Sequence, residues 1–62
     1  MNIFEIIAKG THVGLLMSSG EMITGEFSCW VKEFGSIIIT LPCETGFVQL
    51  DIYKINLFWE VV

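Results

Sequence analysis

The sequence predicts a single mostly β domain, in which a short N-terminal helix precedes five strongly bent antiparallel strands that form a small closed or nearly closed barrel. Its length of 62 residues fits one domain with a marginal core. Short apolar runs alternate with turn residues along most of the chain, as expected for an all-β domain. Gly20 permits a tight turn between the first two strands, and Gly25, inside the second strand, marks a bend or a close backbone approach.

The first residues predict the helix. Asn2, followed three positions later by Glu5, matches the capping-box pattern at a helix N-terminus. The apolar residues that follow recur at helical spacing: Ile3, Phe4, Ile6 and Ile7. Gly10 suits the left-handed position after a helix C-terminus. We expect about two helical turns, which need support from the rest of the fold because so short a helix is unstable alone.

The expected strands span residues 12–17, 22–31, 36–41, 47–53 and 57–62. In the second strand, Ile23, Phe27 and Cys29 share a face. Trp30 does not fit this alternation of apolar residues, which indicates a bend or bulge nearby. Three consecutive isoleucines at 37–39 indicate burial on both faces of the third strand. Pro42 ends this strand, and residues 44–46 form the turn to the fourth.

The composition predicts self-assembly. Apolar residues make up 53% of the chain, too many to hide inside so small a core. The last two strands of the predicted fold are edges, and the final strand is aromatic and nearly uncharged. Pairing of the fourth strand with a neighbour's fifth protects both edges and closes a homo-oligomeric ring. The candidate subunit-interface residues are Tyr53, Leu57, Phe58 and Trp59, with ordinary strand or core packing as the alternative.

The charge argues against a strong nucleic-acid binder. Seven carboxylates face three lysines and no arginine, giving a net charge of −4, so no basic patch is expected. The chemistry of an enzyme is also missing. His12 is the only histidine, Glu21 and Glu26 are interpreted as solvated surface carboxylates, and we expect no cofactor.

Cysteine usage and hydropathy suggest a soluble cytoplasmic protein. Cys29 and Cys43 make neither a disulfide framework nor a zinc-binding spacing, which favours free thiols that act as small hydrophobes. No metal site is expected from these residues. The uncharged stretch from Gly10 to Gly20 is too short to span a bilayer, and Glu5 stands where a signal peptide carries basic residues.

The order of these features resembles the Sm-like family, and within it the Hfq-like proteins. The resemblance rests on the helix, the five bent strands, the spacing of Gly20 and Gly25, and Tyr53-Lys54 between the last two strands. It implies a ring that binds single-stranded, often uridine-rich RNA around its pore. Val31 stands where the family usually has an aspartate, and Phe34-Gly35 where it has a polar residue.

Further departures concern both faces of such a ring. Ile55 replaces the histidine or glycine beside the basic residue matched by Lys54. On the opposite face, Leu16, Glu21 and Met22 replace the aromatic and polar residues of Hfq-like proteins. Phe34 and Lys54 remain as candidate RNA-binding residues, the first for stacking and the second for charge. The alternatives are that Phe34 packs under its loop and Lys54 caps a turn, and that the ring is a protein-interaction scaffold without RNA binding.

Overall fold

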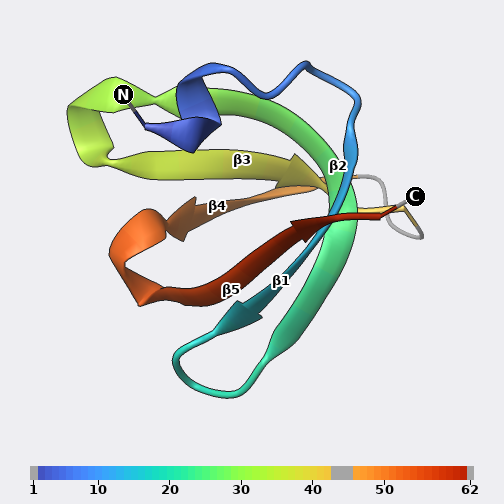
Figure 1. Ribbon diagram of the computed structural model, residues 1–62, viewed down its shortest axis with the longest axis vertical. Coiled ribbons are helices and arrows are strands. Elements are labelled where there is room, and N and C mark those ends of the chain that lie inside the picture. Colours follow the sequence, from blue (N-terminus) through green and yellow to red (C-terminus); the bar gives the residue numbers. More distant parts are fainter. Residues whose placement is uncertain (1, 43–45, 62) are drawn as a thin grey trace.

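The computed structural model describes residues 2–42 and 46–61, and it contains a five-stranded antiparallel sheet with three single-turn 3-10 helices (Figure 1). The strands are β1 His12–Met17, β2 Met22–Val31, β3 Ser36–Thr40, β4 Phe47–Asp51 and β5 Ile55–Glu60. The 3-10 helices are η1 Ile3–Glu5, η2 Lys32–Phe34 and η3 Ile52–Lys54. The sequence-based expectations for Cys43, the turn at 44–45 and the end of the last strand at Val62 lie outside the described residues.

The sheet is curved but open. Its strand order is β4-β3-β2-β1-β5, so the long strand β2 pairs with both β1 and β3, and β4 and β5 form the two edges. Figure 1 shows β2 arching around the other strands. Among the described residues, β4 and β5 do not pair with each other. The mostly β antiparallel fold is therefore confirmed, together with the two expected edges, whereas closure into a barrel is not seen within one chain.

Gly25 lets β2 bend closely over β3. A Cβ atom at this position would clash with the carbonyl oxygen of Thr40 and would lie 2.7 Å from Cγ2 of Ile39. The close backbone approach expected from the sequence is confirmed. At the start of the same strand, the Ser18–Gly20 loop is closed by hydrogen bonds from the Gly20 amide to the Met17 carbonyl, 2.9 Å, and from the Met17 amide to the Glu21 carbonyl, 2.8 Å. Gly20 adopts the positive φ of 94° that this turn requires.

The bulge in β2 lies before Trp30. The register with β3 shifts between Phe27 and Cys29, two residues earlier than the break of phase suggested. The expected common face of Phe27 and Cys29 is therefore wrong, because the extra residue turns the strand over. Phe27 is buried, Cys29 is an exposed free thiol and Trp30 packs against the core. Cys29 therefore does not act as a small buried hydrophobe.

A small core fills the concave side of the sheet. Its buried members come from the inward positions of β1, β2 and β3: Val13, Leu15, Met17, Phe27, Ile37 and Ile39. Ile38, between the two buried isoleucines, is half-buried, so the expected burial of both faces of β3 holds only in part. Val48 and Leu50 of β4 pack against the core while Phe47 is exposed, as the alternation in that strand predicts.

The N-terminal helix is shorter than expected. The capping box is present, with Asn2 Oδ1 accepting from the Phe4 amide at 2.9 Å and Glu5 Oε2 accepting from the Asn2 amide at 3.2 Å. It caps one 3-10 turn rather than two α-helical turns. Gly10 has a positive φ of 92°, but it ends no helix, because its amide donates to the Phe27 carbonyl at 2.8 Å. The chain after η1 is thus fastened to β2 and cannot continue as a helix.

Aromatic contacts hold η1 over the open end of the core. The Phe4 ring stacks on Trp30 with centroids 6.2 Å apart and meets Phe58 edge-on at 5.0 Å. Ile7 packs on the same core. Such aromatic pairs contribute roughly 0.5–1.5 kcal/mol each beyond the burial of their surface. Tertiary packing therefore fixes a turn that the local sequence alone would not keep folded.

The fourth strand also ends earlier than expected. The Asp51 carboxylate accepts a hydrogen bond from the Tyr53 amide at 3.0 Å and caps η3. This cap turns residues 52–54 out of the strand. As a result, β4 stops at Asp51, and β5 begins two residues before the predicted position.

Replacement of Gly25 by alanine tests the bend. We expect Gly25→Ala to lower the free energy of unfolding by about 1–3 kcal/mol, because backbone must move to admit the new methyl group. Urea denaturation measures the change. Gly46→Ala is the matched control, since no atom of the described residues lies within 4 Å of a Cβ there. Equal stability of the two variants would contradict the role assigned to Gly25.

Candidate nucleic-acid interface

The turns η2 and η3 form one continuous surface at the end of the sheet where β2 meets β3 and where β4 leaves for β5. The Ile52 amide donates to the carbonyl of Gly35, at the end of η2, across 3.1 Å. Gly35 has a left-handed φ of 60°, a conformation that glycine adopts without strain. Two turns that are about twenty residues apart in sequence are thereby held side by side.

A further hydrogen bond anchors η3. The Lys54 carbonyl accepts from the Ser18 amide of the first hairpin at 2.7 Å. With the Asp51 cap on one side and Ser18 on the other, the main chain of Tyr53 and Lys54 is fixed while their side chains project into solvent. The fold thus presents these two side chains from a constrained backbone.

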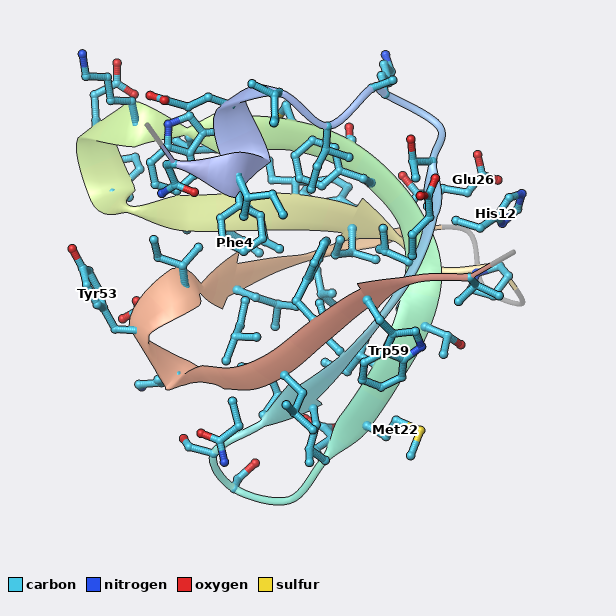
Figure 2. The ribbon with its side chains drawn as sticks, in the orientation of Figure 1. Phe4, His12, Met22, Glu26, Tyr53 and Trp59 are labelled. Atoms are coloured by element: carbon cyan, nitrogen blue, oxygen red, sulfur yellow. The ribbon has the colours of Figure 1, made fainter. Side chains whose placement is uncertain are left out.

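Two aromatic rings are exposed on this surface. Phe34 of η2 is 74% exposed and Tyr53 of η3 is 87% exposed, and Figure 2 shows Tyr53 pointing away from the sheet. Neither ring is in the core, so the alternative that Phe34 packs under its loop is not realised. A Cβ on Gly35 would lie 3.6 Å from Cε2 of Tyr53, which places the tyrosine ring beside the end of η2. Exposed, flat rings of this kind offer stacking surfaces to nucleobases.

The surface is less acidic than the rest of the chain. The turns carry two of the three lysines, Lys32 and Lys54, and the nearby carboxylates are Glu33 and Asp51. These four charges cancel, so the net charge of −4 arises entirely from residues elsewhere. One of the two carboxylates, that of Asp51, already accepts a backbone hydrogen bond. An approaching phosphate therefore meets no net negative charge from the residues of these two turns.

The described residues offer no metal centre. Within residues 2–42 and 46–61, no three side chains of the metal-binding types come together. Glu26 lies opposite His12 in the register of β1 and β2, and both are exposed, as is Glu21 in the hairpin loop. These residues give no enclosed arrangement for acid–base chemistry.

The interface candidates fall into three environments. Tyr53 lies in η3 rather than in a strand. Phe58 points into the concave side and packs against the core and Phe4. Leu57 and Trp59, by contrast, lie on the convex face of the edge strand β5, where they are 58% and 38% exposed.

Sequence reasoning missed the contact between Trp59 and Gly14. These residues are register partners on β5 and β1, and a Cβ on Gly14 would lie only 2.6 Å from Nε1 of Trp59. The indole therefore lies across the glycine and covers the backbone of β1. The pairing of an aromatic with a glycine on a neighbouring strand is the signal that would have located it, but it requires the strand register.

The convex face also carries an apolar row. Leu16 of β1 lies between Met22 of β2 and Leu57 of β5 in the register, and Met22 is 66% exposed. Figure 2 shows Met22 and Trp59 on the same side of the molecule. Together, Leu16, Met22, Leu57 and Trp59 define what we call the convex apolar face.

The chain was compared with protein-family models, with curated proteins and with solved structures, and none of the three comparisons gives a match. In the part of the chain that the structure describes, no helix has the length and apolar character needed to cross a membrane.

Truncation of Trp59 tests its place in the fold. We expect Trp59→Ala to lower the free energy of unfolding by about 2 kcal/mol, because Gly14 cannot replace the lost packing. Thermal and urea unfolding measure the loss, and Met22→Ala, a truncation at a more exposed position of the same face, is the control. An unchanged free energy of unfolding in Trp59→Ala would contradict the place of this residue in the fold.

Proposed function

We propose that the chain is a non-enzymatic, ring-forming Sm-like protein that binds short single-stranded RNA weakly on the η2–η3 surface. The observation that carries the proposal is the pair of exposed rings, Phe34 and Tyr53, held beside Lys54 on two hydrogen-bonded turns. The family resemblance of the sequence gives the same loops this role.

The two unpaired edges support assembly. β4 and β5 terminate the sheet on opposite sides, and each leaves one row of backbone donors and acceptors without a partner strand among the described residues. Pairing of β4 with the β5 of a neighbour would satisfy both rows and continue the sheet around a ring.

The exposed apolar area of the edge strands also supports assembly. Large apolar side chains are more than half exposed on both edge strands, with Phe47 of β4 at 66% and Leu57 of β5 at 58%. In an oligomer, edge pairing would cover part of this area. Since a chain this small has a marginal core, an intermolecular sheet adds stability that the monomer lacks.

The proposed RNA binding is weak because it relies on base stacking and gains little from attraction between lysines and phosphates. Aromatic stacking contributes roughly 1–3 kcal/mol per base in single-strand binding proteins and tolerates any sequence. Lys54, repeated once per subunit, would add a ring of positive charge. Because Glu33 and Asp51 balance the local lysines, few phosphates would be neutralised.

A second function is favoured by the convex apolar face. This face and the net charge of −4 suit a ring that serves as a protein-interaction scaffold and has lost RNA binding. The two functions differ in the surface they use, since the scaffold needs Met22 and Leu57 rather than Phe34 and Lys54. RNA titration therefore separates them.

A charge placed on the edge strand tests assembly. We expect the unmodified chain to be a closed oligomer at micromolar concentration by light scattering, and Leu57→Lys to shift it toward monomer, since an edge lysine opposes strand pairing. Met22→Lys, which adds the same charge to β2 inside the sheet, should keep the oligomer. A folded monomer for the unmodified chain at micromolar concentration would end the ring proposal.

Reversal of one charge tests RNA binding. We expect an oligo-uridine strand to bind at low salt with a shallow salt slope, about −0.7 per phosphate neutralised. Lys54→Glu should abolish binding and leave the oligomer intact, because its side chain is exposed. Lys9→Glu, at another exposed lysine outside the η2–η3 surface, is the control for net charge.

The possible results differ for each proposal. Tight binding that survives Lys54→Glu, or a steep salt slope, would place the RNA on another surface. If Lys9→Glu lowers the affinity for RNA as much as Lys54→Glu does, net charge rather than the η2–η3 surface decides binding. An intact oligomer that binds no strand at low salt would favour the scaffold.

A further inference from the structure

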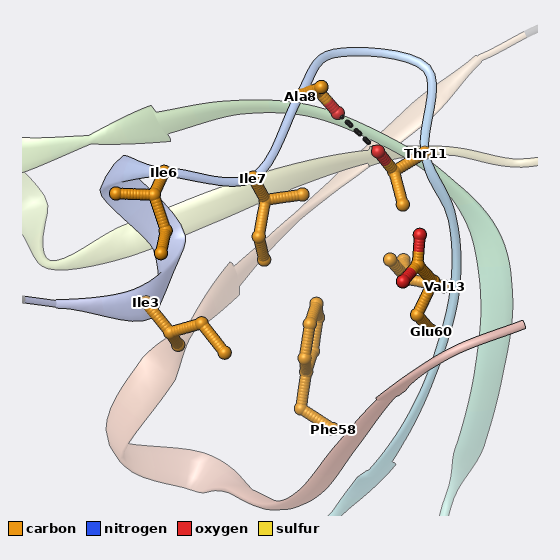
Figure 3. Close-up of a pocket in the computed structure, with 8 residues that line it drawn as sticks. All are labelled: Ile3, Ile6, Ile7, Ala8, Thr11, Val13, Phe58 and Glu60. Atoms are coloured by element: carbon orange, nitrogen blue, oxygen red, sulfur yellow. Dashed lines mark hydrogen bonds between the residues drawn. The ribbon is translucent and has the colours of Figure 1, made fainter.

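A cavity separates the N-terminal turn from the last strand. Its volume is about 390 Å³, within the usual range for small-molecule sites (Figure 3). Eight residues line it: Ile3, Ile6, Ile7, Ala8, Thr11, Val13, Phe58 and Glu60. None of them belongs to η2 or η3, so the cavity is separate from the proposed RNA surface.

The walls are apolar and supported by the core. Val13 is buried, and Phe58 and Ile7 pack against the core cluster. On the side of η1, Ile3 and Ile6 are 55% and 67% exposed, which is unusual for isoleucine and leaves an apolar surface for a ligand. Figure 3 shows the Ile3 side chain directed toward Phe58 across the cavity.

The polar side chains of the cavity lie together at the other end. Figure 3 shows Glu60 and Thr11 on the same side of the cavity, with the Thr11 hydroxyl turned toward Ala8. The Thr11 hydroxyl donates its proton to the Ala8 carbonyl at 2.7 Å, so only its lone pairs remain for a ligand. The Glu60 carboxylate is also an acceptor, and none of the described residues that line the cavity carries a cationic side chain.

We propose that this cavity binds a small organic ammonium ion with an apolar body, such as an arylalkylamine. The ring or alkyl chain would lie between the isoleucines of the N-terminal turn and Phe58, and the ammonium group would donate to Glu60 and Thr11. An alcohol forms weaker hydrogen bonds with the same acceptors, and a carboxylate is repelled by Glu60. The polar end thus selects the charge of the ligand while the walls select its shape.

Three probes of similar shape test the charge preference on the unmodified protein: phenethylammonium, phenethyl alcohol and phenylpropanoate. Each is titrated into isotopically labelled protein and followed by NMR shifts of the backbone amides. We expect the ammonium probe to bind about fivefold more tightly than the alcohol, a modest factor because Glu60 is solvent-accessible. The propanoate should bind most weakly, and the shifts should centre on Ile7, Val13 and Phe58.

Substitutions in the polar end and in the apolar wall of the cavity test the contribution of each part separately. Glu60→Gln should remove the preference for the ammonium probe over the alcohol, whereas Glu21→Gln, at an exposed carboxylate of the hairpin loop, should keep it. Ile3→Ser should weaken both probes by a similar factor, because it alters only the apolar wall. A thermal midpoint recorded for each variant verifies folding.

Several results would overturn the proposal. These are equal affinity for the ammonium and propanoate probes, an unchanged preference in folded Glu60→Gln, or shifts confined to residues of η2 and η3. The comparison of probes on the unmodified protein stands even where a variant fails to fold. The outcome is independent of RNA binding, which uses other residues.

Discussion

The close contact between Gly25 of β2 and the backbone at Thr40 of β3 is the constraint on which the rest of the structure depends. A long strand can cross over a small core only if it bends, and the missing side chain permits the bend. The bulge after Phe27 adds a second change of direction. Without this curvature, five short strands would form a flat sheet with too little interior to bury Leu15, Ile37 and Ile39.

The same curvature determines which surfaces remain available. The strand order leaves β4 and β5 at the margins with exposed apolar side chains, and it brings η2 and η3 together at one end. The cavity beneath η1 lies between the N-terminal segment and β5. Stacking on the turns therefore uses a different region from binding in the cavity, whereas edge pairing and the cavity both involve β5, which contributes Phe58 and Glu60 to the cavity wall.

Sequence patterns correctly predicted the elements that are determined by residues close together in the chain. The alternation of apolar residues predicted the first and last residues of β1 and β2 correctly. Gly20 predicted the hairpin turn, and Asn2 with Glu5 predicted the capping box. Contacts between distant segments explain the differences. The bulge depends on the register with β3, the shortened helix depends on the bond from Gly10 to Phe27, and the packing of Trp59 on Gly14 depends on the register with β5. The exposure of Phe34 and Tyr53 and the acceptor-only end of the cavity likewise require the folded chain.

Hydrogen exchange of the edge-strand amides tests most directly whether chains associate through β4 and β5. The central strands β1, β2 and β3 have partner strands on both sides within one chain, so we expect their amides to be protected and to provide the internal reference. We expect protection in Phe47–Asp51 and Ile55–Glu60 to rise with protein concentration while the reference strands change little. Rapid exchange of the outward amides of both edge strands, unchanged from nanomolar to high micromolar concentration, would contradict it.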